Sequence, residues 1–280
     1  MPHVMLFFAN CKINIGLDIL ARRPDGYHDI ETLMLPVRGL CDAVEALPAE
    51  RDAFSCAGLA VDCPPERNLC LKALRLVRER HAVGPVSLHL LKAVPFGAGL
   101  GGGSSDAAFT IRLLDALFSL ELSDEEMESL AARLGSDTAF FIRNRPALAS
   151  GRGEILTPWT EDGSVPEPLR GKYLAIVKPP FGVGTAEAYR GVRPSVPETP
   201  LRERLAAPLH RWRETVINAF EPSVFALYPQ LAQTKRGLYD AGAVYASLSG
   251  SGSALYGIFE NEVPRAAFPD ECFVYQELIR

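Results

Sequence analysis

The stretch Val94–Ala108 reads VPFGAGLGGGSSDAA, and the interpretation of the whole chain starts from it. Five glycines and two serines fall within nine of these residues. Glycine allows positive φ and lets a ligand approach the main chain closely. Apolar residues at helical spacing follow the loop, so free N–H groups and the positive end of a helix dipole point at one place. The stretch therefore predicts an anion site, and a phosphate is its natural ligand.

Two other nucleotide loops and a linker fit this stretch less well. The spacing G-x-x-x-x-G-K-[ST] of a P-loop is missing. Gly97, Gly99 and Gly102 match the dinucleotide pattern G-x-G-x-x-G, but the preceding strand at 86–94 roughly alternates apolar and polar residues, whereas a central Rossmann strand is apolar on both faces. Pro95 and the helix that follows argue against a flexible linker.

Composition sets wide limits on the class of protein. A chain of 280 residues suits one large or two modest domains, and 48% hydrophobic with 22% charged residues is ordinary for a globular protein. The formal net charge of −5 argues against nucleic acid as a partner. No run of eighteen apolar residues and no signal peptide occurs, so we expect no membrane partner and a cytoplasmic location. The six cysteines and five histidines show no metal-ligand spacing.

The first half of the chain alternates predicted strands and helices. Apolar residues alternate over 13–19, and the turn Arg23–Gly26 leads into a second strand at 28–37, so the two form a hairpin. Helical spacing follows in three segments, at 68–81, 104–118 and 123–134.

Capping residues define the end of this half more closely. Ser123 and Glu126 form a capping box for the third helix, and Gly135 suits the position just after it. Ser136 is expected to cap a further short helix that begins at Asp137.

A stretch rich in proline, glycine and charge, 159–172, separates two domains, which we place at 1–160 and 161–280. The charged residues Arg152 and Glu154, with the stretch 202–214, are expected to form a solvated face. The order of the elements predicts an α+β sandwich. The second domain is expected to hold strands at 173–178, 244–248, 254–259 and 273–278, and helices at 208–226 and 228–240.

Three further segments carry polar residues of the kind found in active sites: Cys11–Asn14, Leu134–Thr138 and Ser247–Ser253. With the glycine loop, they resemble the signature motifs of the GHMP kinase superfamily, which phosphorylates small metabolites from ATP. The resemblance extends from Lys12 to the last strand. It implies an α+β fold of two domains, with a ribosomal-protein-S5-domain-2-like N-terminal domain and a ferredoxin-like C-terminal domain.

The string Arg23–His28, followed by Thr32, narrows this resemblance. It is similar to the signature R-x-D-G-Y-H-x-[ILV]-x-[ST] of one branch of the superfamily. That branch phosphorylates the 2-hydroxyl of a methylerythritol bearing a cytidine diphosphate group, in the non-mevalonate pathway to isoprenoids. The resemblance therefore implies a small-molecule substrate with a cytidine diphosphate group, and it leaves a monomer and a homodimer both open.

The resemblance also implies the catalytic pair. Asp137 matches the catalytic aspartate, which would accept or orient the proton of the attacking hydroxyl. Lys12 matches the catalytic lysine, whose charge would keep the aspartate ionised and offset charge on the transferred group. Both functions require the two side chains to meet beside the triphosphate.

The binding residues follow from the same match. Mg²⁺ is expected to arrive with ATP, held largely by phosphate oxygens, and its protein ligands stay unknown. Tyr27 and Tyr189 would stack on the cytosine, and His28 would recognise the edge of the base. The substrate contacts are Asn14, Tyr27, His28, Thr185 and Tyr189. The residues that would wrap the triphosphate are Pro95, Phe96, Gly97, Ala98, Gly99, Leu100, Gly101, Gly102, Gly103, Ser104 and Ser105.

Two departures from the family pattern and two alternatives remain. The family usually has proline two residues after the aspartate, whereas this chain has Ala139 there. Asp106 is not chosen as the base, because some related sequences have asparagine there. Another kinase of the superfamily, acting on homoserine, mevalonate or a sugar, stays possible, although the Tyr27-His28 string argues against it. A silent ATP-binding module also stays possible, although Lys12 and Asp137 are both retained.

Overall fold

The computed structural model describes residues 4–60 and 64–280, which form two compact units. Cys63, one of the six cysteines, lies outside the described residues. Neither unit is continuous in sequence. The first unit comprises the described residues of Met1–Cys11 with Pro36–Phe96 and Gly101–Asn144, and the second comprises Lys12–Leu35, Gly97–Leu100 and Arg145–Arg280.

The predicted hairpin is present as two long strands, β1 (Met5–Arg22) and β2 (His28–Pro48), which pair with each other. In the first unit, β2 also pairs antiparallel with β4 (Val86–Lys92), and β4 pairs parallel with β3 (Ala53–Gly58). Alternate residues of β4 are buried, because one face of this sheet packs on the core.

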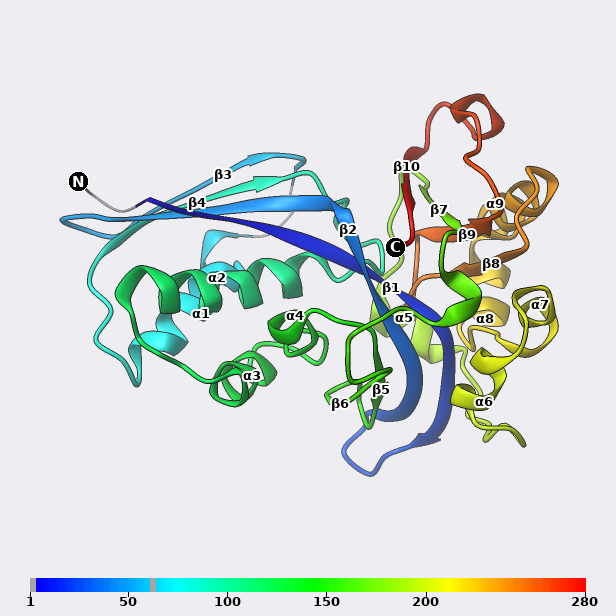
Figure 1. Ribbon diagram of the computed structural model, residues 1–280, viewed down its shortest axis with the longest axis horizontal. Coiled ribbons are helices and arrows are strands. Elements are labelled where there is room, and N and C mark those ends of the chain that lie inside the picture. The colour runs from blue at the N-terminus through cyan, green and yellow to red at the C-terminus, as the bar shows by residue number, and fades with distance from the viewer. Residues whose placement is uncertain (1–3, 61–63) are drawn as a thin grey trace. The chain divides into compact units, whose positions relative to one another are not determined.

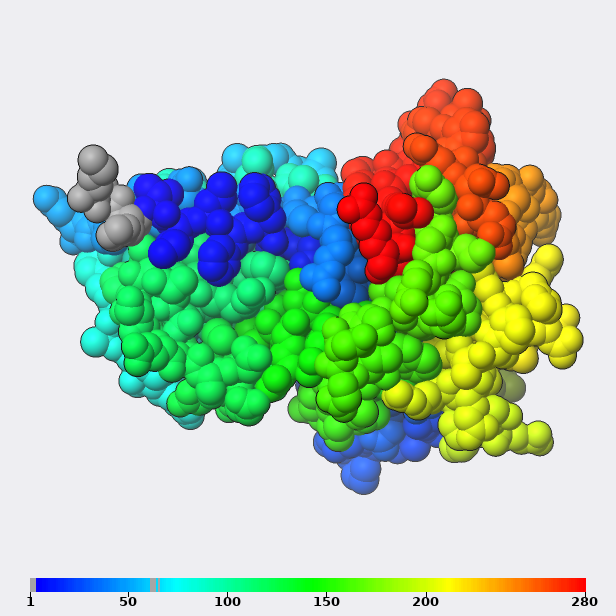
Figure 2. Space-filling view, in the orientation of Figure 1, coloured from blue at the N-terminus to red at the C-terminus, as the bar shows by residue number. Residues whose placement is uncertain are grey.

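Two helices cover that face of the sheet in Figure 1, α1 (Leu69–Arg78) and α2 (Gly102–Phe118), and they contact each other. The side chain of Asn68 accepts a hydrogen bond from the first turn of α1 and so fixes where that helix begins. The early part of β1, dark blue in Figure 2, forms surface of the same unit, and Leu6 and Phe8 are exposed on it.

The capping box of Ser123 and Glu126 is confirmed at the start of α3 (Asp124–Ala132). The short helix predicted from Asp137 is wrong: residues 136–139 form a turn, and α4 (Phe140–Arg143) begins later without a side-chain cap. The backbone there makes hydrogen bonds of the 3₁₀ type, between residues three apart, in place of α-helical bonds. The first of them runs from Thr138 N–H to the Gly135 carbonyl. Gly135 does not have the left-handed conformation expected of a terminating glycine.

The second unit is built on a four-stranded antiparallel sheet with the order β10-β7-β9-β8. Its core is formed by side chains of this sheet and of two helices, α8 (Glu221–Leu227) and α9 (Pro229–Asp240). The four predicted strands are thus confirmed as β7 (Tyr173–Lys178), β8 (Tyr245–Leu248), β9 (Leu255–Phe259) and β10 (Phe273–Leu278).

The remaining elements are short. In the second unit, β5 (Ala147–Ser150) pairs with β6 (Ile155–Pro158) and with Thr32–Met34 of β2. The short helices are η1 (Pro65–Arg67), η2 (Glu167–Leu169), α5 (Thr185–Arg190), α6 (Leu201–Ala206), η3 (Leu209–Arg211), α7 (Trp212–Thr215) and η4 (Arg265–Ala267). Together the elements confirm the α+β class. Among the described residues, none of the helices combines the length and the apolar character that crossing a bilayer needs.

The helix predicted over 208–226 is interrupted. Leu17 N–H donates to the Ile217 carbonyl at 2.9 Å, and Ala219 N–H donates to the Leu17 carbonyl at 2.8 Å. This bridge to β1 uses backbone groups that a continuous helix would need, so the helical turns stop before it and start again after it.

The solvated face predicted for 202–214 is wrong for Arg204. Its side chain is buried, forms an ion pair with Asp18, and donates to the carbonyls of Thr199 at 3.0 Å and Thr215 at 2.8 Å. Burial raises the pKa of the Asp18 carboxyl, and the Arg204 guanidinium opposes this rise. A buried charge of this kind is tolerated because it is paired and its guanidinium is hydrogen-bonded through each of its three nitrogens.

Candidate active site

The glycine loop contributes to both units. Its residues Gly101–Ser105 lie in the first unit, where α2 begins at Gly102, two residues earlier than predicted. Gly101 precedes the helix with φ of 71°, a left-handed conformation that glycine adopts without strain. Ser105 N–H donates to the Gly101 carbonyl at 2.9 Å, so the N–H groups just before it precede the helical ladder. This helix start has the geometry that favours an anion.

The middle of the loop, Gly97–Leu100, lies in the second unit. Gly99 has φ of 73°, and a Cβ there would collide with the Ser249 carbonyl oxygen. The Ser249 hydroxyl donates to the Gly99 carbonyl at 2.9 Å, and Ala254 N–H donates to the Ala98 carbonyl at 3.0 Å. Close backbone approach therefore requires glycine at this position.

Lys12 and Asn14 are buried side chains of β1, as their spacing predicts for one strand face. The Lys12 ammonium donates to the Gly99 carbonyl at 3.0 Å and to Asn14 Oδ1. Asn14 Nδ2 donates to Thr32 Oγ1 at 3.2 Å, and the Thr32 hydroxyl donates to the Gly16 carbonyl at 2.5 Å. A chain of hydrogen bonds thus fixes the position of the ammonium group.

The second glycine-serine loop, 249–253, is anchored through its hydroxyl groups. Ser249 Oγ accepts from Asn14 N–H at 3.3 Å. Ser251 Oγ lies 3.3 Å from Thr185 Oγ1, and Ser253 Oγ donates to the Phe181 carbonyl at 2.5 Å. The loop therefore supports both the strand that carries Lys12 and the helix α5.

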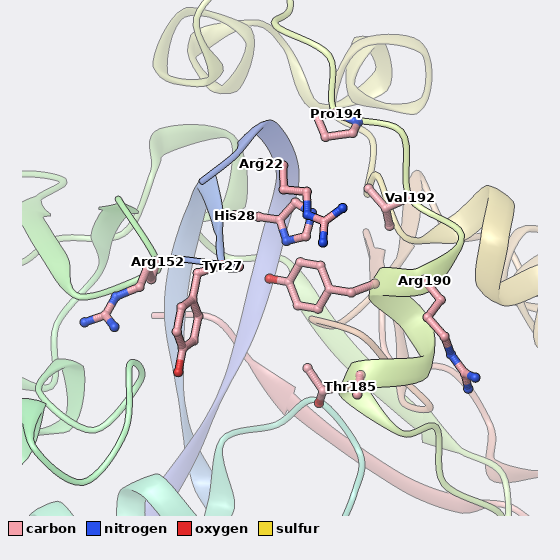
Figure 3. A pocket seen from close by; sticks show the side chains of 11 residues that line it. Arg22, Tyr27, His28, Arg152, Thr185, Arg190, Val192 and Pro194 are labelled. Carbon is pink, nitrogen blue, oxygen red and sulfur yellow. The ribbon is translucent and has the colours of Figure 1, made fainter. Parts of the chain in front are cut away.

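A cavity of about 760 Å³ lies in the second unit (Figure 3). The sequence predicted four of its lining residues from separate segments, and the structure brings all four to this cavity: Tyr27, His28, Thr185 and Tyr189. Its other lining residues are Arg22, Gly26, Arg152, Ala186, Arg190, Val192 and Pro194. Asn14, the fifth predicted substrate contact, lies in the chain with Lys12 and does not line this cavity.

The rings in this cavity are arranged unequally. His28 and Tyr189 stack with centroids 4.7 Å apart and an interplanar angle of 18°. Phe220 meets Tyr189 edge to face at 4.8 Å. Tyr27 is 55% exposed, so it offers the more open ring to a ligand. Stacking of a base on Tyr27 and Tyr189 stays a prediction.

The cavity is also lined by three arginines that the sequence did not predict as site residues: Arg22, Arg152 and Arg190. Arg152 was assigned to a solvated face, and it is exposed, but its guanidinium carbon also lies 5.0 Å from the centroid of the Tyr27 ring. Among the described residues that line the cavity, none is acidic, but Arg152 pairs with Glu154 at 3.3 Å and Arg190 with Glu187 at 3.7 Å. This wall suits an anionic ligand, and no sequence signal distinguishes such lone arginines from ordinary surface charges.

Asp137 lies half-buried in the turn 136–139 of the first unit. Lys12 belongs to the second unit, so the meeting of these two side chains stays a prediction. The neighbouring Thr138 is fully buried, and its hydroxyl has no hydrogen-bond partner among the described residues.

A buried ionic cluster in the first unit involves Asp106. The Lys92 ammonium pairs with Asp106 at 2.7 Å and with Asp42, whose other oxygen accepts from the N–H groups of Ala93 and Val94. Burial raises the pKa of the Asp106 carboxyl, Lys92 opposes the rise, and Asp42 adds to it. These contacts tie α2 to the strand that enters the glycine loop.

Two families match separate parts of the chain. Residues 68–145 match "GHMP kinases N terminal domain", and residues 201–271 match "GHMP kinases C terminal". The predicted domain boundary at 160/161 falls between these matches and stays a prediction.

Whole-length relatives extend the comparison. The chain is 43% identical over 275 residues to a 4-diphosphocytidyl-2-C-methyl-D-erythritol kinase of Parabacteroides distasonis, covering 97% of this chain and 98% of the relative. It is 46% identical over 262 residues to the kinase of the same name from Bacteroides thetaiotaomicron, covering 92% and 93%.

Solved structures agree with these relatives. A crystal structure of 4-(cytidine 5'-diphospho)-2C-methyl-D-erythritol kinase is similar with a TM-score of 0.74 and 34% identity, covering 91% of this chain and 90% of that one. A mevalonate kinase structure has a TM-score of 0.71 at 13% identity over 99% of both chains, which shows a shared fold.

Proposed function

This chain belongs to the GHMP kinase family, and on that premise we propose that it transfers the γ-phosphoryl group of ATP to the 2-hydroxyl of 4-diphosphocytidyl-2-C-methyl-D-erythritol. The protein is an ATP-dependent small-molecule kinase. The reaction forms the 2-phosphate and ADP in the non-mevalonate pathway to isoprenoid precursors. Kinases named for this substrate share 42–46% of their residues with most of the chain.

The observation that carries the proposal is the cavity lined by Tyr27, His28, Thr185 and Tyr189. A cytidine diphosphate group combines a flat base with two phosphates, so it needs aromatic surface and positive charge in one place. The cavity supplies exposed aromatic surface at Tyr27 and positive charge at Arg22 and Arg190. Aromatic stacking is worth on the order of 1–3 kcal/mol per base but accepts every base, so hydrogen bonding at His28 must select cytosine.

In the proposed reaction, the 2-hydroxyl oxygen attacks the γ-phosphorus, and the bond from that phosphorus to the β,γ-bridging oxygen breaks. Asp137 accepts or orients the proton of the hydroxyl as the new bond forms. Lys12 supplies a positive charge beside the transferred group. Its hydrogen bonds to Asn14 and the Gly99 carbonyl support this role, because they fix the ammonium before substrate arrives.

The triphosphate is assigned to Pro95–Ser105, because α2 begins at Gly102 without a side-chain cap and its first turn directs N–H groups toward this loop. Mg²⁺ would arrive with ATP, held largely by phosphate oxygens, and would neutralise part of the phosphate charge. Within the ranges described above, no three or more of His, Cys, Asp and Glu gather in the way a protein-built metal site requires. We assign the enzyme to the cytoplasm, where ATP is made available to it, and we propose a monomer or homodimer.

The test combines a panel of acceptors with one substitution. Purified protein is incubated with labelled ATP and with the cytidyl alcohol, homoserine, mevalonate or galactose, and ADP and phosphorylated product are measured. We expect product only with the cytidyl alcohol, and competition by CMP and CDP. Phosphorylation of another acceptor with no inhibition by CMP would refute the assignment of substrate.

Asp137→Asn tests the mechanism. Turnover should fall about 10²- to 10⁴-fold, which is the usual contribution of a general base, while the KM for ATP stays within about twofold. The control is Asp124→Asn, which removes an exposed carboxylate from the first turn of α3. Unchanged turnover in Asp137→Asn would remove this residue from the mechanism.

A further inference from the structure

Arg152 makes a cation–π contact with another side chain that lines the cavity, Tyr27. Its guanidinium lies over the Tyr27 ring, 5.0 Å from the ring centroid. Figure 3 shows Arg152 and His28 on opposite sides of Tyr27. The guanidinium therefore covers one face of the phenol ring, while the ring also lines the cavity.

Tyr27 is more than half exposed, so a contact on its ring helps to order it. The backbone is fixed by hydrogen bonds across the turn, from Arg23 N–H to the Tyr27 carbonyl at 2.8 Å and from Tyr27 N–H to Asp25 Oδ1 at 3.1 Å. These bonds hold the backbone and do not involve the side chain of this residue, which is 55% exposed. Ordering a mobile ring opposes the binding of a base on it.

Arg152 is itself presented from a fixed turn. Its N–H donates to Glu154 Oε2 at 2.6 Å, and its Nε lies 3.3 Å from Glu154 Oε1. Ile30 N–H donates to the Gly151 carbonyl at 2.7 Å, which ties the turn to β2. Since β2 begins just after Tyr27, this hydrogen bond ties the turn that carries the cation to the strand that follows the ring.

We propose that Arg152 is a positioning residue for substrate recognition: its cation–π contact holds the Tyr27 ring as a platform on which the pyrimidine of the substrate stacks. This inference rests on the proposed function, because it takes the cytidyl group as the ligand. It assigns to Arg152 an effect on the base that acts through Tyr27. A direct attraction between the guanidinium and the diphosphate is the competing explanation.

The experiment measures inhibition by cytidine, CMP and CDP in the wild type and in Arg152→Met, which keeps length and removes the charge. We expect the three inhibition constants to rise by about three- to fivefold alike, as loss of an exposed cation–π contact predicts. The KM for the cytidyl substrate should rise by the same factor, with kcat and the KM for ATP within about twofold.

The matched control is Arg213→Met. Arg213 lies over the Tyr239 ring at 4.2 Å, so the substitution removes the same kind of contact from residues that do not line the cavity. Its inhibition constants should equal those of the wild type. Midpoints of thermal unfolding are compared for both variants, and Arg152 is exposed, so we expect Arg152→Met to fold.

A double-mutant cycle supplies the decisive readout. In a Tyr27→Leu background, Arg152→Met should have no further effect on the inhibition by cytidine. An undiminished effect there, a loss that grows from cytidine to CDP, or no loss in any inhibition constant would each overturn the positioning role. Failure of the proposed function looks different, because then the wild type itself would not be inhibited by any of the three compounds.

Discussion

Replacing Thr32 by valine tests the chain of hydrogen bonds that holds Lys12. Thr32 is fully buried, and valine has nearly the same shape. The substitution removes the acceptor of the 3.2 Å bond from Asn14 and the donor of the 2.5 Å bond to the Gly16 carbonyl. Both partners stay buried and lose a hydrogen bond each, so the variant probes the chain without opening a cavity.

The expected size of the effect follows from these two bonds. A buried hydrogen bond contributes about 1 kcal/mol to stability, so the free energy of unfolding should fall by about 2 kcal/mol. For a protein of this length, the midpoint of thermal unfolding should fall by about 5 °C. The Asn14 amide then loses its fixed orientation, and with it the Lys12 ammonium loses a fixed acceptor. We expect kcat to fall by about tenfold, because small displacements of catalytic groups are costly.

Thermal unfolding and steady-state kinetics measure both effects, with Thr32→Ser as the control. Serine keeps the hydroxyl and removes one methyl group, so it should cost about 1 kcal/mol and leave kcat near the wild-type value. The KM for ATP should stay within about twofold in both variants. Equal kcat values for the valine and serine variants would refute the positioning of Lys12 through Asn14.

Two further predictions concern stability. Burial raises the pKa of Asp106 to about 8 from an unfolded value of about 3.9, so its proton stabilises the fold fully below about pH 4, and this contribution is lost as pH rises towards 8. Asp106→Asn should therefore reduce the fall in the free energy of unfolding between pH 5 and 9, measured by urea unfolding. If this free energy fell equally steeply with pH in the variant and the wild type, the raised pKa would not belong to Asp106. Gly99→Ala should cost about 2 kcal/mol or more, because its Cβ meets the Ser249 carbonyl, whereas Gly26→Ala, at positive φ in open space, should cost about 1 kcal/mol. If both glycine variants lost similar free energies of unfolding, the expected collision with the Ser249 carbonyl would contribute nothing.

Local signals predicted much of the fold. The turn Arg23–Gly26 produced the hairpin, and the pair Ser123 and Glu126 located the start of α3. The errors arose where distant partners decide the conformation. The bridge from Leu17 stops the helix predicted over 208–226, and Asp18 draws Arg204 into the interior. Neither partner is visible in the local pattern.

The residues of the candidate site also fall into those that the sequence predicted and those that it did not. Tyr27 and His28 belong to the string that carries the family resemblance, and the structure places both in the cavity. Thr185 and Tyr189 were found through family resemblance, although the sequence did not predict the helix α5 that carries them. Arg152 had no signal, because its significance comes from the ring that it covers.

The alternating serines of 249–253 restrict how this protein can change in length. Each hydroxyl reaches a different segment, through Asn14, Thr185 and Phe181. Deleting or inserting one residue would turn every later hydroxyl to the wrong side and release α5 from its anchor. Insertions and deletions among natural relatives should therefore accumulate in stretches such as 264–271, whose residues are mostly exposed, and spare this short turn.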